Sequence, residues 1–248
     1  MKQQILSQGW TLTIPEDNVY HIGPDPIPAT IPGSVYSCLL ENGLMPDPYW
    51  RDNELDALKL MENDFVFTEH FAPEEGLLSL DRVILRFDGI DTIADIFLNG
   101  TFLGHTENMH RSFEFEVKDL LRDGENELSV KLYSPTKFIA ACHEKTGNME
   151  STDAMPGYPQ LRKAHCMFGW DWGPRLPDAG LYRPVRLLGV KKARLSDDVR
   201  VMQEHEIEEN GIHGNVVKSV RLSVTAQTDP AEAAGVHTEI TLTGPDGT

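Results

Sequence analysis

The strongest constraint on the fold of this chain is a strict alternation of apolar and charged residues in short runs. In residues 111–117 (RSFEFEV), aromatic and aliphatic side chains alternate with Glu114 and Glu116. Residues 126–135 (NELSVKLYSP) repeat the pattern with leucine and valine. A period of two residues places every second side chain on the same face of an extended strand. These runs therefore predict antiparallel β-strands with one buried face and one solvent-facing side.

Turn residues separate further runs of the same kind. These runs are residues 64–71 (DFVFTEHF), 82–89 (RVILRFDG), 93–105 (IADIFLNGTFLGH) and 181–190 (LYRPVRLLGV). The pair Asn99-Gly100 lies inside the third of them, between two apolar segments. Because Asn-Gly favours the type I′ turn of a two-residue hairpin, we expect two antiparallel strands joined at Asn99 and Gly100.

Helical patterning is scarce in comparison. Residues 32–43 (PGSVYSCLLENG) predict one helix, with Ser34 as the N-cap, an apolar stripe and Gly43 as the stop. Many short strands, long connections and little helix indicate an all-β fold. An immunoglobulin-like sandwich takes about 100 residues. Since the patterned segment is nearly twice as long, we predict a jelly-roll β-sandwich for residues 1–192.

The pattern changes in residues 193–248. Three shorter strands are predicted there, at residues 198–211, 219–230 and 237–247. An immunoglobulin-like sandwich needs about seven strands, so this second domain is predicted to be a truncated one. An unpaired sheet edge would then favour association with a second copy of the chain.

Composition excludes several classes of partner. The chain carries 22 Lys and Arg against 39 Asp and Glu, a formal net charge of −17. Such a surface repels phosphate backbones and anionic membranes, so neither nucleic acid nor a membrane is expected as a partner. No apolar run approaches the roughly 18 residues of a membrane span, and no signal peptide is visible. The cysteines Cys38, Cys142 and Cys166 form no CxxC pair, which favours reduced thiols in a cytoplasmic protein.

Signatures for metals and cofactors are also lacking. The stretch HEKTG at His143 has Gly147 where a zinc metalloprotease motif needs its second histidine. The acidic residues 47–56 lack the ligand spacing and the turn glycine of a calcium loop. No glycine-rich phosphate loop is present. We therefore expect neither a metal nor a cofactor.

Residues 135–182 are predicted to be a long connection that ends in the stretch FGWDWGP. Two of the four tryptophans, Trp170 and Trp172, flank Asp171 there. An indole packs against the apolar face of a pyranose, and a carboxylate accepts strong hydrogen bonds from two adjacent hydroxyls. The alternative is that the aromatic side chains plug the end of the sandwich while Asp171 caps a turn. Residue chemistry alone leaves both interpretations open.

Four stretches, taken in order, resemble the N-terminal region of the β-mannosidases of glycoside hydrolase family 2. They are IPGSVYSCLLENGLMPDPYW, LRFDGIDTIADIFLNGTFLGHTENMHRSFEFEV, NELSVKLYSP and LRKAHCMFGWDWGPRLPDAGLYRPVRL. The resemblance covers about residues 1–190, and GWDWGP is its most specific element. It implies a galactose-binding-domain-like jelly roll, then an immunoglobulin-like domain, then a TIM barrel that carries both catalytic glutamates. This chain would end before the barrel and be inactive alone, as part of a retaining hydrolase of β-mannosides.

The same resemblance implies roles for particular residues. Trp170 and Asp171 match the loop that contacts the sugar in the −1 subsite. Trp172 matches a position that anchors this loop more than it contacts substrate, and Asn108 is a weaker candidate for a sugar contact. The chain departs from the family beside the loop, with His165 in place of a frequent glutamine.

Three rival functions remain at this stage. The first is another family 2 specificity, such as a β-galactosidase, because the specificity pocket lies mostly on the barrel. The second is a stand-alone carbohydrate-binding module, and the third is a purely structural β-domain. Under the leading hypothesis, the loop in this chain should point into solvent.

Overall fold

The computed structural model describes residues 1–147, 151–196, 199–209, 214–230, 236–237 and 239–244. The chain divides into two compact units. One spans Lys2–Gly189, and the other comprises Val190–Thr248 together with Met1. Within the described residues, none of the helices is long and apolar enough to cross a membrane. The three cysteines are free.

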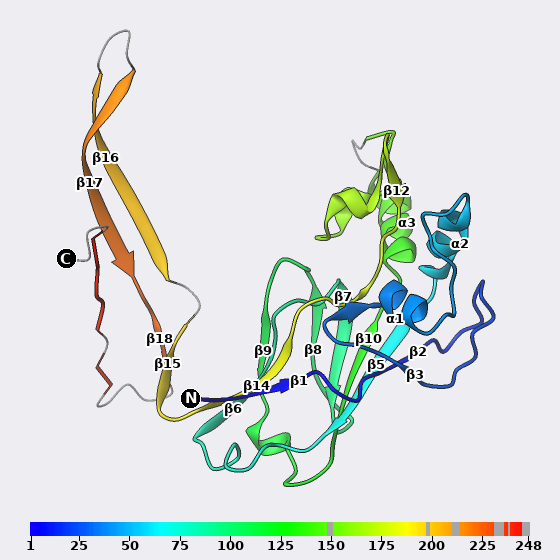
Figure 1. The fold of residues 1–248 in the computed structure, drawn as a ribbon, viewed down its shortest axis with the longest axis horizontal. Helices are drawn as coiled ribbons and strands as arrows, with labels where there is room; N and C mark the ends of the chain where they lie inside the picture. Colours follow the sequence, from blue (N-terminus) through cyan, green and yellow to red (C-terminus); the bar gives the residue numbers. More distant parts are fainter. Residues whose placement is uncertain (148–150, 197–198, 210–213, 231–235, 238, 245–248) are drawn as a thin grey trace. The chain divides into compact units, whose positions relative to one another are not determined.

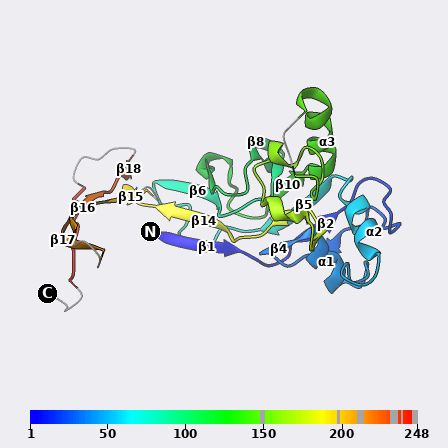
Figure 2. The same ribbon diagram turned by 90° about the horizontal axis from the view of Figure 1, so that it is seen from above.

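The first unit is a sandwich of two antiparallel sheets (Figure 1). The four-stranded sheet has the order β1 (Lys2–Leu6), β14 (Val185–Val190), β6 (Arg82–Phe87), β9 (Phe113–Glu116). The six-stranded sheet has the order β3 (Ile27–Pro28), β2 (Thr11–Thr13), β5 (Phe65–Phe71), β10 (Asn126–Leu132), β7 (Ile93–Leu98), β8 (Thr101–Glu107). Figure 2 shows β1 lying beside β14 along the unit. The all-β sandwich predicted from the alternating runs is confirmed.

The core contains the apolar positions that the alternation selected. In β10, Leu128, Val130 and Leu132 are fully buried, and Lys131 between the last two faces outward. Leu132 pairs with Phe65 and Val130 with Phe67 of β5, so both strands contribute their apolar faces to one cluster. Burial of this apolar surface is the main force that holds the sheets together.

The predicted hairpin is formed by β7 and β8. Asn99 and Gly100 connect the strands with φ values of 52° and 80°, the left-handed conformation that a type I′ turn requires at both positions. The Asn99 side chain donates to the carbonyl of Leu120 at 2.9 Å and to Asn126 Oδ1 at 2.8 Å. The turn is therefore fixed by side-chain contacts as well as by its own backbone preference.

Of the three α-helices among the described residues, only α1 (Val35–Glu41) was predicted. Its N-cap is Ser34, whose hydroxyl accepts from the backbone N–H of Ser37 at 3.2 Å. The helices α2 (Asn53–Leu60) and α3 (Pro135–Thr146) correct the sequence prediction. The segment 135–182 is thus not an irregular connection throughout, because its first quarter is helical. Ser134 caps α3, accepting from Lys137 N at 3.0 Å, with Pro135 in the first turn.

The second unit contains two separate pairs of strands. β15 (Ala193–Leu195) pairs with β18 (Thr228–Pro230), and β16 (Arg200–Glu209) pairs with β17 (Asn215–Thr225). The strand predicted at 237–247 is wrong for its described residues, 237 and 239–244, which are not in a strand; the others lie outside the described part. A strand needs a hydrogen-bonded neighbour, which alternation alone does not supply. The immunoglobulin-like character of this unit and the domain boundary at residue 192 stay predictions.

Candidate functional site

The GWDWGP stretch forms a short β-hairpin at one end of the sandwich. β11 (Phe168–Trp170) pairs with β12 (Gly173–Arg175), and Trp170 lies opposite Gly173. Asp171 and Trp172 therefore form the two-residue tip. Figure 1 shows β12 rising beside α2 and α3. The sequence places an acid between two indoles, and the hairpin presents all three together.

The tip of the hairpin is exposed. Trp170 is 49% exposed and Trp172 is 84% exposed, and Asp171 is also exposed. The two indole rings lie 5.9 Å apart between centroids and are tilted by 49°. Solvent can therefore reach both rings and the carboxylate, as the leading hypothesis expected.

The base of the hairpin is buried, in contrast to its tip. Phe168 is fully buried in a small apolar cluster with Ile93, Ile139 and Leu161. The carbonyl of Phe168 also accepts from the backbone N–H of Met155 at 3.0 Å. Of the three aromatic residues in this stretch, only Phe168 is buried in the way that the plug interpretation requires. Trp172 is the most exposed of the three aromatic residues, and its role as an anchor of the loop stays a prediction.

Contacts from distant segments fix the direction of the hairpin. Glu54 in α2 accepts from the backbone N–H of Arg175 at 2.7 Å, across 121 residues of sequence. Gly169 has a φ of 107°, and a Cβ there would lie 2.8 Å from Arg175 Cγ. Only glycine adopts this conformation readily without strain, so the backbone at the base of the hairpin depends on Gly169.

A buried ion pair joins Lys163, in the segment before the hairpin, to Asp91, between β6 and β7. The Lys163 ammonium is fully buried and contacts the carboxylate of Asp91. It also donates to the carbonyl of Asp178 at 2.6 Å. Burial lowers the pKa of Lys163, opposed by the attraction of Asp91. Losing one partner of such a pair costs about 3–5 kcal/mol, because the other charge stays buried.

Asp178 connects the segment after the hairpin to α1. Its Oδ1 accepts from the backbone N–H groups of Tyr36 and Ala179, at 3.1 and 2.8 Å. Burial raises the pKa of Asp178 to about 6, against the lowering effect of these hydrogen bonds. Sequence reasoning missed the contact of Glu54 with the hairpin, and it missed the buried groups Lys163, Asp91 and Asp178. No local pattern signals them, because each acts through a contact with a distant segment.

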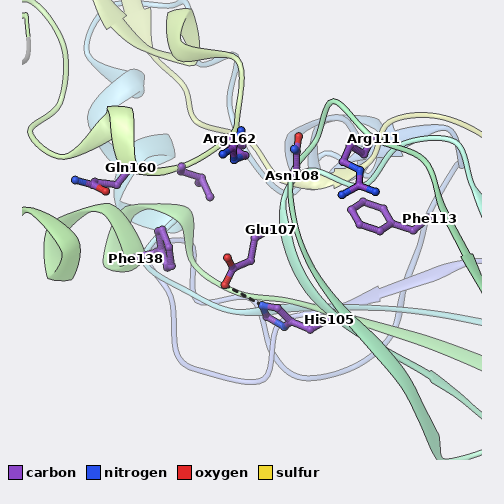
Figure 3. A pocket seen from close by; sticks show the side chains of 9 residues that line it. His105, Glu107, Asn108, Arg111, Phe113, Phe138, Gln160 and Arg162 are labelled. Carbon is purple, nitrogen blue, oxygen red and sulfur yellow. Dashed lines mark hydrogen bonds and ion pairs between the residues drawn. The ribbon is translucent and has the colours of Figure 1, made fainter. Parts of the chain in front are cut away.

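Asn108 lies at a different place from the tip of the hairpin. Its backbone forms a parallel bridge with Arg162, and its Oδ1 accepts from His110 N at 2.9 Å. It lines a cavity of about 370 Å³ together with Arg111, Arg162 and other residues (Figure 3). Neither Trp170 nor Asp171 lines this cavity. The structure thus brings Trp170, Asp171 and Trp172 together but leaves Asn108 apart from them, and its sugar contact stays a prediction.

His105 lines the same cavity and was not singled out from the sequence. Its Nδ1 lies 2.6 Å from Asp95 Oδ1, and its Nε2 lies 3.3 Å from Glu107 Oε1. Burial opposes the charged imidazolium, but the hydrogen bonds to both carboxylates outweigh it and raise the pKa of His105. Asp95 also accepts from the Tyr133 hydroxyl at 2.6 Å, which raises the pKa of Tyr133 to about 12. Within the described part of the chain, no group of His, Cys, Asp and Glu could hold a metal ion.

Comparison with known proteins places this domain in a family. The model of the family described as glycosyl hydrolase 2 galactose-binding domain-like matches residues 10–183. The chain belongs to this family. The match includes the GWDWGP hairpin and every strand of the two sheets except β1 and β14. The resemblance inferred from the sequence is therefore confirmed for this domain.

Relatives within the family are β-mannosidases. The β-mannosidase of Mus musculus is 29% identical over 230 residues, which are 88% of this chain and 25% of the relative. β-Mannosidase B of Aspergillus terreus is 33% identical over 198 residues, 79% of this chain and 23% of that protein. This family 2 chain thus spans about a quarter of the length of these curated relatives.

Solved structures agree with this assignment. The crystal structure of a β-D-mannosidase from Dictyoglomus thermophilum is 30% identical with a TM-score of 0.74, covering 92% of this chain and 31% of that one. An exo-chitosanase from Amycolatopsis orientalis is 15% identical with a TM-score of 0.60, covering 94% of this chain and 25% of that one. The second likeness shows the fold alone.

Proposed function

We propose that this chain is the non-catalytic N-terminal part of a retaining exo-β-mannosidase. In that enzyme, the hairpin would supply Trp170 and Asp171 to the −1 sugar subsite of a catalytic barrel. The observation that carries the proposal is the contrast between a buried, tethered hairpin base and an exposed Trp-Asp-Trp tip. A rigid base with an exposed aromatic and acidic tip suits a surface that is completed by another part of the protein.

The chemistry of the tip fits a pyranose. The Trp170 indole offers a flat apolar face to the C–H groups of a sugar ring, while Trp172 packs beside it at 5.9 Å. Asp171 can accept from two neighbouring hydroxyls, and hydrogen bonds to a charged acceptor are about twice as strong as neutral ones. The pair therefore selects for ring orientation and for hydroxyl positions at once.

Catalysis itself belongs elsewhere in this proposal. A retaining glycosidase needs two carboxyl groups about 5–5.5 Å apart, one as the acid/base and one as the nucleophile. We assign neither role to a residue of this chain and expect the isolated chain to be inactive. The length of the β-mannosidase relatives, about four times the matched segment, supports this division of labour.

The test substitutes residues of the tip in a full-length protein. This protein begins with the present chain and is as long as the β-mannosidase relatives. Asp171→Asn should lower kcat/KM on aryl β-mannosides about tenfold or more, since a hydrogen bond to a charged group is worth about 1.5–3 kcal/mol. Trp170→Ala should act in the same direction. Phe102→Ala, at another exposed aromatic of the same domain, is the control and should leave kcat/KM unchanged.

Two outcomes would reject the proposal. Unchanged kcat/KM in the Trp170→Ala, Asp171→Asn double variant would remove the subsite role. Faster hydrolysis of β-galactosides than of β-mannosides by the wild-type enzyme would favour the β-galactosidase-like alternative.

Calorimetry on the isolated chain tests the alternative of a stand-alone carbohydrate-binding module. We expect no saturable binding of mannose, because small-ligand sites enclose most of the ligand and the tip covers one side.

A further inference from the structure

The cavity that His105 and Asn108 line has features that the mannosidase proposal does not use. It encloses about 370 Å³ between the end of β8, α3 and the 3₁₀ turn Tyr158–Gln160. Sites for small molecules typically enclose about 300–1,000 Å³, so the cavity is large enough for one small ligand. Figure 3 shows the side chains that surround it.

Two arginines without a carboxylate partner line the cavity. Arg82, Arg86 and Arg186 of the same unit each contact a carboxylate oxygen at 3.0 Å or less. Among the described residues, neither Arg111 nor Arg162 has an ion pair, although Asp and Glu outnumber Lys and Arg by 39 to 22. Arg111 instead lies over the Phe113 ring, 6.0 Å from its centroid. A guanidinium group without a carboxylate partner keeps its charge and its N–H donors available to an anion.

Backbone contacts join the two segments that carry these arginines. Asn108 and Arg162 form a parallel bridge, and Met109 N donates to the Arg162 carbonyl at 3.0 Å. The sulfur of Met109 lies 2.9 Å from Ala164 N, and the Tyr182 hydroxyl donates to the Met109 carbonyl. The backbone segments around Asn108 and Arg162 are therefore held in place. Holding them in advance lowers the conformational entropy that is lost when a ligand binds.

The remaining lining favours a sugar over a bare ion. Phe113 and Phe138 are half-buried and lie on opposite sides of the cavity in Figure 3. Aromatic walls of this kind pack against apolar C–H faces. The Glu107 carboxylate points toward His105, to which it is hydrogen-bonded at 3.3 Å, and away from both arginines. The Glu107 carboxylate can therefore accept hydrogen bonds from sugar hydroxyls without directly repelling an anion bound at the arginines.

We propose that this cavity binds a single sugar residue that carries an anionic substituent. Arg111 and Arg162 would hold the oxyanion, and the two phenylalanines would contact the ring. The site does not require the mannosidase proposal, because it uses neither Trp170 nor Asp171 and lies wholly within this chain.

The 248-residue chain itself can be titrated with three probes by calorimetry. Glucuronate should bind with a dissociation constant in the millimolar range or tighter. Methyl β-glucoside, which lacks the charge, and inorganic phosphate, which lacks the ring, should each bind at least about tenfold more weakly. Raising the ionic strength should weaken the binding of glucuronate, since the arginines are exposed to screening.

Variants then assign the site. Arg111→Gln and Arg162→Gln should each weaken glucuronate binding about tenfold, in line with loss of one charged hydrogen-bond donor. Arg51→Gln is the matched control, because Arg51 also lies over an aromatic ring, that of Trp50 at 5.6 Å, and does not line the cavity. All three positions are exposed, so circular dichroism should show unchanged folding.

Four results would overturn the proposal. These are no glucuronate binding, equal binding of methyl β-glucoside, equal binding of inorganic phosphate, and binding that both cavity variants leave intact. Equal binding of phosphate would reduce the cavity to a plain anion site, and equal binding of the neutral glucoside would make the arginines irrelevant.

Discussion

At the scale of single residues, Glu69 stands out in the core. It lies on the inward face of β5 in line with Phe65, Phe67 and Phe71, and it is only 3% exposed. Its Oε2 accepts no hydrogen bond from the described residues. Burial raises the pKa of this carboxyl to about 8, because the charged form loses its hydration. Glu69 is therefore protonated at neutral pH in the folded protein.

The raised pKa of Glu69 predicts a pH-dependent stability. In the unfolded chain a glutamate titrates near pH 4.3, so the folded state binds the extra proton between about pH 4.3 and 8. The contribution of Glu69 to stability is complete below pH 4.3 and is lost as the pH rises through 8. Glu69→Gln should remove this loss of stability with rising pH. One unit of pKa shift corresponds to about 1.4 kcal/mol of unfolding free energy.

Urea denaturation of wild type and Glu69→Gln at pH 5 and pH 8.5 measures this effect. The variant should gain stability relative to wild type between the two pH values. A constant difference would show that Glu69 titrates normally.

Which side chains of β5 face the core depends on the register of the strand, which the sequence shows only in part. In the run of residues 64–71, the alternation is clear at Phe65 and Phe67 and less clean at His70 and Phe71. In the structure, the alternation runs on without a break, so Glu69 and Phe71 are buried and His70 is exposed. Residue chemistry would have put the glutamate outside. The pairing of β5 with β10, in which Glu69 lies opposite Leu128, decided otherwise.

At the scale of elements, the hairpin Phe168–Arg175 shows how two glycines differ. Gly169 has a left-handed φ of 107°, and a Cβ there would also lie 3.2 Å from the Asp153 carbonyl oxygen. At Gly173, a Cβ would meet Trp170 Cβ at 3.5 Å, an ordinary contact, and φ is not left-handed. The two positions are thus a matched pair on opposite strands.

Gly169→Ala should therefore loosen the hairpin, whereas Gly173→Ala should not. Holding a non-glycine residue in a sparsely populated backbone region costs about 1–3 kcal/mol. Amide hydrogen exchange should become faster by tenfold or more in residues 168–175 of Gly169→Ala, since about 1.4 kcal/mol corresponds to a factor of ten. Equal protection in both variants would show that the hairpin tolerates a side chain at either position.

The elements that sequence reasoning found are those with a strong local signal. Alternation, the Asn99-Gly100 turn and the Ser34 cap are all local, and each agrees with the structure. Helix α3 was missed because only Pro135, Thr136 and Ile139 in it are buried, too few for an apolar stripe. Its position is set by the packing of Ile139 with Phe168 and Leu161, residues far along the chain.

At the scale of the whole molecule, the two units differ in how much they bury. The unit Lys2–Gly189 has a continuous core between its two sheets. In the other unit, every residue of β17 is exposed, including Val220, Leu222 and Val224. A two-stranded hairpin without a buried face is marginally stable in water at best.

Limited proteolysis should therefore cut the chain within residues 199–230 first. The sandwich should survive as a resistant fragment that keeps all four tryptophans, at positions 10, 50, 170 and 172. Mass spectrometry of the products and tryptophan fluorescence before and after cleavage test this. A first cut inside Lys2–Gly189, or a loss of the fluorescence signal on cleavage, would contradict it.

The sequence by itself determined the alternating strands of the first unit, their main turn and the all-β sandwich, because periodicity and turn chemistry act between residues that are close along the chain. It also singled out Trp170, Asp171 and Trp172 by their composition. Only the tertiary structure decided which distant segments contact the hairpin and which side chains share a buried pair or a cavity. Lys163 meets Asp91 across 72 residues, Arg175 meets Glu54 across 121, and Arg162 reaches the cavity with Arg111. Such contacts depend on how the sheets and loops pack, which no local pattern encodes.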